Sequence, residues 1–366
     1  MIVKCPHCGG ALEFNPQSGK MECQFCGSTY ESESDIVYEN NENIECNIYT
    51  CTSCGAELMV NGVESSSFCA YCGQPTVVFS RISKEMKPDY IIPFRLTREQ
   101  AFQNVREKFG KGAMVPNEIK NFQIEKMRGI YIPYFIYDMN YRDKQGLERR
   151  GGRNTPTVYY IREAECEFKG ILHDASKQLK DESANYLEPY NLSELIPFQP
   201  QYLSGFYADK YDLNQQEIIE CGVKRAKEFF DAELIKRIGN PGVSIKCCNP
   251  AYKIQRIQYA LLPAWFITFR YKDEPYTILV NGQTGKVVGT VPFDKGKIWK
   301  TFLLSWLGFA ALLIPIAPLL GGHFGMIIGL SLCMKAYSDF KKIRKTMEMT
   351  KSQSTMKYVK ERQDKI

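Results

Sequence analysis

The cysteine spacing at the N-terminus constrains this chain of 366 residues more than any other feature. The pattern C-x2-C-x14-C-x2-C occurs twice within the first 72 residues. Two Cys-x-x-Cys pairs about fifteen residues apart supply the four soft ligands that a tetrahedral zinc ion prefers. The sequence therefore predicts two sites that each hold one structural Zn²⁺. Their ligands are Cys5, Cys8, Cys23 and Cys26 in the first site, and Cys51, Cys54, Cys69 and Cys72 in the second.

The residues around these cysteines predict a zinc ribbon, repeated once. Each Cys pair is followed directly by glycine, which allows the chain to turn sharply so that backbone N–H groups point at the sulfurs. Between the pairs, the segments ALEF and KMEC flank NPQSG and read as strand, turn and strand. A segment this short buries little apolar surface, so metal binding must supply its folding energy, roughly 10–16 kcal/mol for structural zinc.

Other uses of the cysteines are less consistent with the sequence. Disulfides require an oxidising compartment, and the chain shows no N-terminal secretory signal. A rubredoxin-like iron site shares the ligand set, and a catalytic zinc normally keeps an open position. His7 reads as an exposed bystander, Cys46 as a spare ligand or an ordinary buried thiol, and Cys247-Cys248 as core or surface thiols. The remaining cysteines, which have no metal-site spacing, are Cys166, Cys221 and Cys333.

A long apolar segment near the C-terminus predicts contact with a membrane. From Thr301 to Met334 the chain carries no Asp, Glu, Lys or Arg, and prolines and glycines interrupt the middle of this stretch. We therefore expect residues 298–337 to form a transmembrane or re-entrant helical hairpin. Lysines and arginines flank both sides, which predicts a protein of the cell membrane with both termini cytoplasmic. A buried hairpin of a soluble protein is the alternative.

Charge is distributed unevenly along the chain. Residues 1–80 hold two basic and ten acidic residues, whereas residues 335–366 hold ten basic and four acidic ones. Each zinc with four thiolates adds a formal charge of −2, so the ribbons form a strongly acidic module. An acidic surface repels phosphates, which argues against nucleic acid as a partner. The basic tail, 338–366, instead suits anionic membrane lipid, although a solvated tail is nearly as good an interpretation.

The predicted fold is a multidomain one. It comprises two small β zinc ribbons, an α+β middle domain and the C-terminal hairpin. Within the middle domain, periodicity and capping signals predict helices over Thr97–Phe109 and Asn214–Ile238. Strands are expected over 129–142, 158–168, 260–271 and 275–280, and two similar Pro-led aromatic strands suggest a duplicated unit. The boundaries are ribbon 1 at 1–30, an acidic linker at 31–45, ribbon 2 at 46–80, the α+β domain at 81–297, the hairpin at 298–337 and the tail at 338–366.

The sequence gives little support for catalysis. Histidine occurs only at His7, His173 and His323, and no Ser-His-Asp or Cys-His arrangement is visible. No Walker-type phosphate loop is present either. The alternating Glu163, Glu165 and Glu167 read as a solvated strand face in preference to acid–base or metal-binding groups. We therefore predict that the protein is not an enzyme and has no catalytic residues.

The first ribbon resembles a known bacterial family. The run Cys5-Pro6-His7-Cys8-Gly9-Gly10-Ala11-Leu12-Glu13-Phe14-Asn15-Pro16, then Gly19, then Cys23-Gln24-Phe25-Cys26-Gly27, is similar to the TFIIB-type ribbon of bacterial membrane proteins. These are often labelled primosomal-protein-N′-like. The resemblance implies two ribbons and a C-terminal hairpin. It also implies cytoplasmic partners of the PspA type or the flotillin-like SPFH type, recruited to the membrane during envelope stress.

These observations predict a membrane-anchored zinc-ribbon adaptor, or scaffold, that recruits cytoplasmic partner proteins. An oligomer is compatible with this role. Two other functions stay open: a membrane-bound enzyme with its site in the α+β domain, and a nucleic-acid-binding regulator that uses the ribbons.

Overall fold

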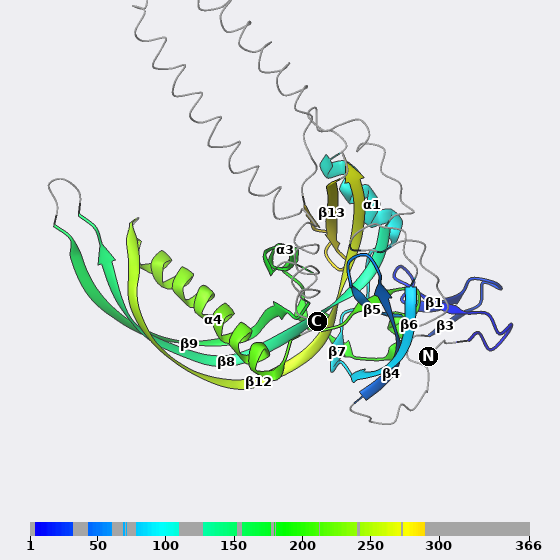
Figure 1. The fold of residues 1–366 in the computed structure, drawn as a ribbon, viewed down its shortest axis with the longest axis horizontal. Coiled ribbons are helices and arrows are strands. Elements are labelled where there is room, and N and C mark those ends of the chain that lie inside the picture. The colour runs from blue at the N-terminus through cyan, green and yellow to red at the C-terminus, as the bar shows by residue number, and fades with distance from the viewer. Residues whose placement is uncertain are drawn as a thin grey trace, which may run out of the picture.

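The structure is a computed structural model (Figure 1), and it describes most of the first 289 residues in several stretches. These are residues 4–31, 43–60, 69, 71, 78–109, 127–151, 156–176, 179, 181–211, 213–239, 242–271 and 274–289.

The N-terminal residues form a small antiparallel sheet of their own. Its strands are β1 (Leu12–Asn15), β2 (Lys20–Cys23) and β3 (Thr29–Glu31), in the order β1-β2-β3. Asn15 pairs with Lys20 at the turn, where the Gly19 N–H donates to the Asn15 carbonyl over 2.9 Å. The strand, turn and strand predicted for the first ribbon are therefore confirmed. Phe14 packs edge-on against Tyr202 with ring centroids 5.2 Å apart, which attaches this sheet to the body of the protein.

All other described strands belong to one large sheet. The main path runs in the order β10-β7-β12-β8-β11-β5-β4-β6, while β9 pairs with β8, and β13 pairs with β12 and β14. Its members are β4 (Asn43–Cys51), β5 (Glu57–Val60), β6 (Val78–Met86), β7 (Tyr90–Ile91), β8 (Met127–Arg149), β9 (Val158–Asp174), β10 (Ile196–Pro197), β11 (Tyr207–Asp209), β12 (Val243–Tyr271), β13 (Glu274–Asn281) and β14 (Val287–Val288). The strands that carry the second cysteine set thus pair into the same sheet as the middle of the chain.

Three long strands leave the body as a curved arm. β8 has 23 residues and β12 has 29, and they pair antiparallel from Val243↔Arg149 to Ile267↔Met127. β9 lies along the other side of β8. Figure 1 shows β9, β8 and β12 curving together, with α4 (Gln215–Ile238) on their concave side. We refer to these three strands and α4 as the arm.

The helices begin and end where the sequence signals place them. α1 (Arg98–Phe109) is preceded by Thr97, whose hydroxyl accepts from the Gln100 N–H over 3.3 Å. α4 has a capping box between Asn214 and Glu217 and ends at Gly239 in the left-handed conformation, with φ of 68°. Both predicted helices are confirmed. The remaining described helices are short: α3 (Asp181–Leu187) and the 3₁₀ turns η2 (Leu192–Glu194) and η3 (Pro200–Leu203).

Aromatic side chains fill the core where the arm meets the body. Phe94 stacks on Phe206 with ring centroids 4.2 Å apart, and it also contacts Tyr131 and Trp265. All four are nearly inaccessible to solvent. The high aromatic content therefore serves a sheet core, as buried rings contribute large apolar areas.

The predicted fold class, a multidomain protein with two separate ribbons and an α+β middle, is wrong. In the described residues, an α+β domain is replaced by a mostly β structure in which long strands run continuously from body to arm. The two Pro-led aromatic strands, expected to mark a duplicated unit, are the neighbouring strands β8 and β12 of one sheet. One cause is that the expected strand over 129–142 stops at polar residues such as Asp143 and Gln145, yet these are buried within β8.

The described residues give no support to the predicted membrane localisation, and the predicted hairpin does not fall within them. Within the described stretches, we find no helix that combines the length and the apolar character needed to cross a membrane. α4 is long enough, at 24 residues, but charged side chains line its exposed face. As far as the described residues go, this finding stands against the expected cell-membrane location with both termini cytoplasmic. Residues 298–337, and the tail 338–366, lie outside the described residues.

Candidate metal centre

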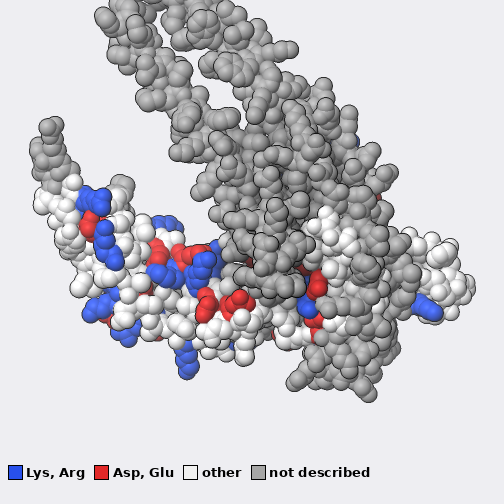
Figure 2. Space-filling model, viewed as in Figure 1, with Lys and Arg blue, Asp and Glu red and all other residues white. Residues whose placement is uncertain are grey.

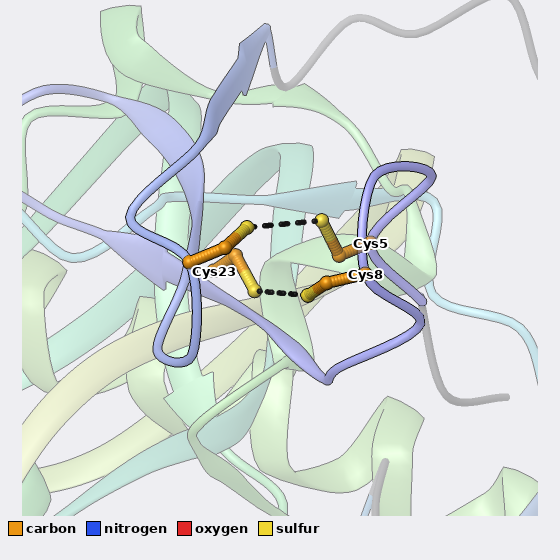
Figure 3. Close-up of side chains that lie close together, drawn as sticks. Cys5, Cys8 and Cys23 are labelled. Atoms are coloured by element: carbon orange, nitrogen blue, oxygen red, sulfur yellow. Dashed lines mark hydrogen bonds between the residues drawn. The ribbon is translucent and has the colours of Figure 1, made fainter.

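The first four cysteines converge on one point between two loops of the small sheet. The Sγ atoms of Cys5, Cys8, Cys23 and Cys26 all lie within 4.8 Å of one another. Cys5 and Cys26 are 3.6 Å apart, and Cys8 and Cys23 are 3.4 Å apart. Figure 3 shows Cys5 and Cys8 on one loop, facing Cys23 across a narrow gap. A tetrahedral zinc with Zn–S bonds of about 2.3 Å places its sulfurs about 3.8 Å apart, so the set fits this ion.

The backbone turns in the same way at three cysteine pairs. The Gly9 N–H donates to the Cys5 carbonyl, the Gly27 N–H to Cys23 and the Gly55 N–H to Cys51, over 2.8–2.9 Å. The three glycines have φ of 75°, 70° and 71°, a conformation in which other residues are strained. The prediction that these glycines permit the sharp turn is confirmed for these three pairs. In the fourth pair, Cys72 and the glycine that follows it, Gly73, lie outside the described residues.

Neighbouring hydroxyls and thiols shift the pKa values of the first cage. The Tyr30 hydroxyl, 3.3 Å from Cys5 Sγ, lowers the pKa of that thiol to about 6. The Ser28 hydroxyl lies 3.2 Å from Cys26 Sγ and lowers the pKa of Cys26. For Cys8, the Gly10 N–H acts to lower the pKa, but the nearby Cys23 and Cys26 thiols outweigh it and raise the pKa to about 12. The crowded sulfurs cannot all ionise alone, whereas a bound divalent cation would stabilise all four thiolates.

The second cage is buried in the large sheet. Cys51 ends β4, and Cys54 lies in the turn that leads to β5. Cys54 and Cys69 have their Sγ atoms 3.7 Å apart, and Cys51 completes a group within 4.8 Å. All three are buried, with Cys54 wholly inaccessible. Cys72, the fourth predicted ligand, lies outside the described residues.

A buried polar group lies beside the second cage. The Tyr71 hydroxyl donates to Asp209 Oδ2 over 2.7 Å, and Ser176 Oγ donates to the same oxygen. Burial, reinforced by the Asp209 carboxylate, holds the pKa of Tyr71 well above its usual range, so its hydroxyl stays protonated and donates. The Tyr71 ring also packs edge-on against Phe266 at 5.3 Å. Through Asp209 on β11, the segment that carries Cys69 and Tyr71 is connected to the centre of the large sheet.

The two cages therefore differ in environment despite their identical spacing. In the first, Cys8 and Cys26 are exposed while Cys5 and Cys23 are buried. In the second, all three described ligands are buried among apolar side chains of the central strands, including Ile130 and Phe266. The first cage lies at the surface of the molecule, whereas the second belongs to its core.

The other candidate residues lie apart from both cages. Glu163, Glu165 and Glu167 are exposed on β9, and Arg142 pairs with Glu163, so the prediction of a solvated strand face is confirmed. Cys46 is half-buried, its Sγ lies 3.8 Å from the Ser83 carbonyl, and burial raises the pKa of its thiol to about 11. These contacts suit an ordinary thiol. Cys247 and Cys248 are exposed, His7 is exposed, and His173 contacts the Asp174 carbonyl.

Two features near the cages were missed by the sequence reasoning. Phe25, between two ligands of the first cage, has 82% of its surface exposed. Its place inside a Cys-x-x-Cys pair could have signalled this, because the loop that holds a metal points its middle residues outward. The buried Tyr71–Asp209 contact joins residues 138 positions apart and carries no local signal.

Comparison with known proteins supports the metal-binding character of the N-terminus. A family model described as Trm112p-like protein matches residues 1–31, which include all four ligands of the first cage and the strands β1–β3. A protein of Bacillus subtilis (strain 168), described as uncharacterized protein YdjG, is 28% identical over 341 residues. That match covers 88% of this chain and the whole of the relative. No solved structure matches the chain. The cysteine clusters and the family match together indicate metal binding, with a ligand chemistry that fits zinc.

Proposed function

We propose that this protein is a docking adaptor whose metal-folded N-terminal ribbon binds partner proteins. The observation that carries the proposal is the exposed Phe25, held on the metal-binding loop between Cys23 and Cys26. A rigidly held, exposed aromatic ring is suited to a contact, because aromatic residues dominate the binding energy of protein interfaces.

The loop holds Phe25 in a defined position. A side-chain Cβ at Gly10 would lie 2.7 Å from Phe25 Cδ2, so the ring packs directly over the Gly10 backbone. The Gly27 N–H donates to the Cys23 carbonyl over 2.9 Å and closes the loop behind the ring. A ring that is already fixed loses little conformational entropy on binding. The cage therefore holds the apolar Phe25 ring in a fixed position, ready to contact a partner.

Charge indicates the chemistry of the partner surface. The ribbon, residues 1–31, carries two basic and three acidic residues, and a zinc ion held by four thiolates adds a formal charge of −2. A partner of this ribbon is expected to combine an apolar pocket for Phe25 with basic residues around it. Nucleic acid has the opposite requirement, because its phosphates need Lys and Arg.

The resemblance of the first ribbon to TFIIB-type ribbons suggests specific candidates. We propose PspA-type proteins and flotillin-like SPFH proteins as the first partners to test. This part of the proposal rests on the ribbon motif from Cys5 to Gly27 alone.

The proposal is tested with purified proteins. The zinc-loaded full chain is titrated with a PspA-type and with an SPFH-type protein, and Kd is measured by isothermal calorimetry for wild type and Phe25→Ala. We expect binding to at least one partner, weakened about 30-fold by Phe25→Ala, the size of a typical hot-spot loss. Tyr252→Ala, which removes a 50% exposed ring from the arm, is the matched control and should leave Kd unchanged.

Two results would contradict the proposal. Equal affinity of wild type and Phe25→Ala would show that the ribbon loop is not the docking site. Salt-sensitive binding of DNA or RNA that is lost in Phe25→Ala, without binding to either protein, would favour a nucleic-acid-binding function.

A further inference from the structure

A basic cavity lies at the free end of the arm, far from both cysteine cages. Its volume is about 450 Å³, and it lies between the last turn of α4 and the ends of β8 and β9. Three arginines line it: Arg149, Arg162 and Arg237. The rest of the lining is apolar or aromatic, from Val158, Tyr160, Leu234 and Ile238. Figure 2 shows Lys and Arg side chains near the free end of the arm.

The positive charge of this cavity is only partly balanced by nearby groups. None of its described lining residues carries a carboxylate. Glu233, which pairs with Arg237 over 2.9 Å, is also shared with Lys236 at 3.7 Å. The Arg162 guanidinium lies over the Tyr160 ring at 5.0 Å, which holds its planar face in place. The α4 carbonyl end, which disfavours an anion, is partly capped because the Gly239 N–H donates to the Ile235 and Lys236 carbonyls. The guanidinium groups therefore dominate the local charge.

This lining selects a ligand that is both acidic and apolar. Guanidinium groups bind carboxylates through paired N–H donors, and the apolar walls require a hydrophobic side chain between those carboxylates. A bare phosphate would leave the apolar walls unused. The chemistry favours a short peptide in which acidic residues flank an apolar core.

One such segment is present in this chain. Residues 32–42 contain Glu33, Asp35, Glu39 and Glu42 with Ile36-Val37-Tyr38 in the middle, and no basic residue. β3 and β4, which flank the segment, lie at the opposite end of the described structure from the arm tip (Figure 1), which favours a contact between copies over one within a copy. We propose that the cavity binds the 32–42 segment of a second copy of the protein.

The contact would be heterologous, joining the ribbon end of one copy to the arm end of the next. Such contacts form rings or open chains, because each copy keeps one free donor and one free acceptor surface. The protein is therefore expected to associate head to tail, with an affinity that falls as salt screens the charges.

A peptide titration tests the cavity directly. A fluorescein-labelled peptide of residues 32–42 is titrated with the full chain, and Kd is read from fluorescence anisotropy. The double variant Arg162→Gln with Arg237→Gln should weaken binding at least tenfold, since two charge-assisted contacts are lost. Arg150→Gln is the matched control: Arg150 adjoins the cavity in sequence but does not line it, and Kd should change less than about threefold.

A second peptide tests the apolar part of the proposal. The peptide with Ile36→Ser, Val37→Ser and Tyr38→Ser keeps its charge but should bind at least tenfold more weakly. Three results would overturn the proposal. They are equal binding of both peptides, no binding of either peptide, and an equal Kd for wild type and the double arginine variant. Displacement of the peptide by a single-stranded oligonucleotide of lower Kd would assign the cavity to nucleic acid instead.

Sedimentation velocity with the full chain tests whether the contact joins two copies of the protein. One variant has a neutralised cavity (Arg162→Gln with Arg237→Gln), and the other a neutralised segment (Glu33→Gln, Asp35→Asn and Glu39→Gln). Each alone should stay monomeric, whereas their mixture should form one-to-one dimers, because a single intact contact remains. Wild type should form larger species as its concentration rises. A wild type that stays monomeric at all concentrations, or a mixture without dimers, would contradict the proposal.

Discussion

At the residue scale, the two cages have one spacing but two environments, and their ligands should not be equivalent. Cys8 is exposed at the edge of a small sheet, whereas Cys54 is wholly buried beside the central strands. Removing an exposed ligand affects mainly the fold of residues 4–31. Removing a buried one leaves three thiols and an unfilled ligand position within the core, where unsatisfied polar groups are costly.

We therefore predict that Cys8→Ser and Cys54→Ser each lower the bound zinc from two ions to one per chain but differ in stability. Cys8→Ser should leave the main thermal transition within about 2 °C of wild type, while Cys54→Ser should lower it by more than about 5 °C. Metal content is measured by mass spectrometry of the ions, and Tm by calorimetry. Equal Tm losses in the two variants would contradict the assignment of one cage to the surface and the other to the core.

Asp138 links three strands where the arm bends. It lies on β8 at the register shifts toward β9 and β12, accepts from the Gly170 N–H over 2.9 Å and pairs with Arg256. Partial burial would raise its pKa, but the Gly170 N–H and the Arg256 guanidinium outweigh it and hold the pKa below its usual range. Because the folded state binds the proton less well than the unfolded one, this group stabilises the fold above its ordinary pKa. That contribution is lost as pH falls through the lowered value.

We predict that Asp138→Asn lowers Tm at pH 7 and that the difference from wild type narrows as pH falls below about 4. Thermal unfolding from pH 7 to pH 3 measures this. Glu165→Gln, at an exposed position on β9, is the control and should leave Tm nearly unchanged throughout. A difference that stays constant over the whole pH range would show that the carboxylate charge is not the cause.

At the element scale, α4 packs on the arm through a contact that tolerates no side chain. Gly222 lies on the buried face of the helix, and a Cβ there would come within 2.5 Å of the Tyr137 ring on β8. Tyr137 also donates from its hydroxyl to the Ile218 carbonyl over 2.7 Å, one turn earlier. The helix and the strand therefore approach closely because position 222 is glycine.

Gly222→Ala should destabilise the protein by about 1–3 kcal/mol, although alanine favours helix by about 1 kcal/mol over glycine. The double variant with Tyr137→Leu should show a smaller loss than the sum of the two single variants, because leucine removes the clashing ring. Urea unfolding supplies the free energies. Lys224→Ala, on the exposed face, is the control; a stabilising Gly222→Ala would show that the helix can shift away from Tyr137.

The sequence predicted both long helices more accurately than the long strands, and the arm explains why. The Asn214–Glu217 capping box and Gly239 are local signals that specify α4 without any tertiary contact. The expected strand over 129–142 ends before the polar run Asp143-Lys144-Gln145-Gly146, yet Gln145 donates to Asp143 over 2.8 Å and to Asp231 over 2.6 Å beneath α4. Lys227 of α4 also pairs with the buried Asp143 of β8 over 4.0 Å. These polar contacts between β8 and α4, such as the one that joins residues 86 positions apart, have no signature in the strand itself, so β8 was predicted too short.

At the scale of the whole molecule, the second cage connects to the centre of the sheet along a short path. β4 pairs with β5, β5 with β11, and β11 with β8. The Tyr71–Asp209 hydrogen bond adds a side-chain contact between β11 and the segment that carries Cys69 and Tyr71. The cysteine spacing predicted both candidate metal sites, but it treated the second as a separate ribbon. Its position in the large sheet depends on pairings between residues about 150 apart, which spacing cannot reveal.

Removal of metal should therefore loosen the body of the protein while leaving the arm folded. With a strong chelator, we expect hydrogen exchange to rise in residues 4–31, then in β4, β5 and β11, because each relies on a cage or on a neighbour of one. The arm part of β8 and the middle of α4 contact neither cage and should keep their protection, supported by Phe230 against Tyr141 at 5.2 Å. Hydrogen exchange with mass spectrometry measures this, with Cys8→Ser as the control that loses only the first metal. Uniform loss of protection, reaching the arm as fast as β11, would show instead that body and arm unfold as one cooperative unit.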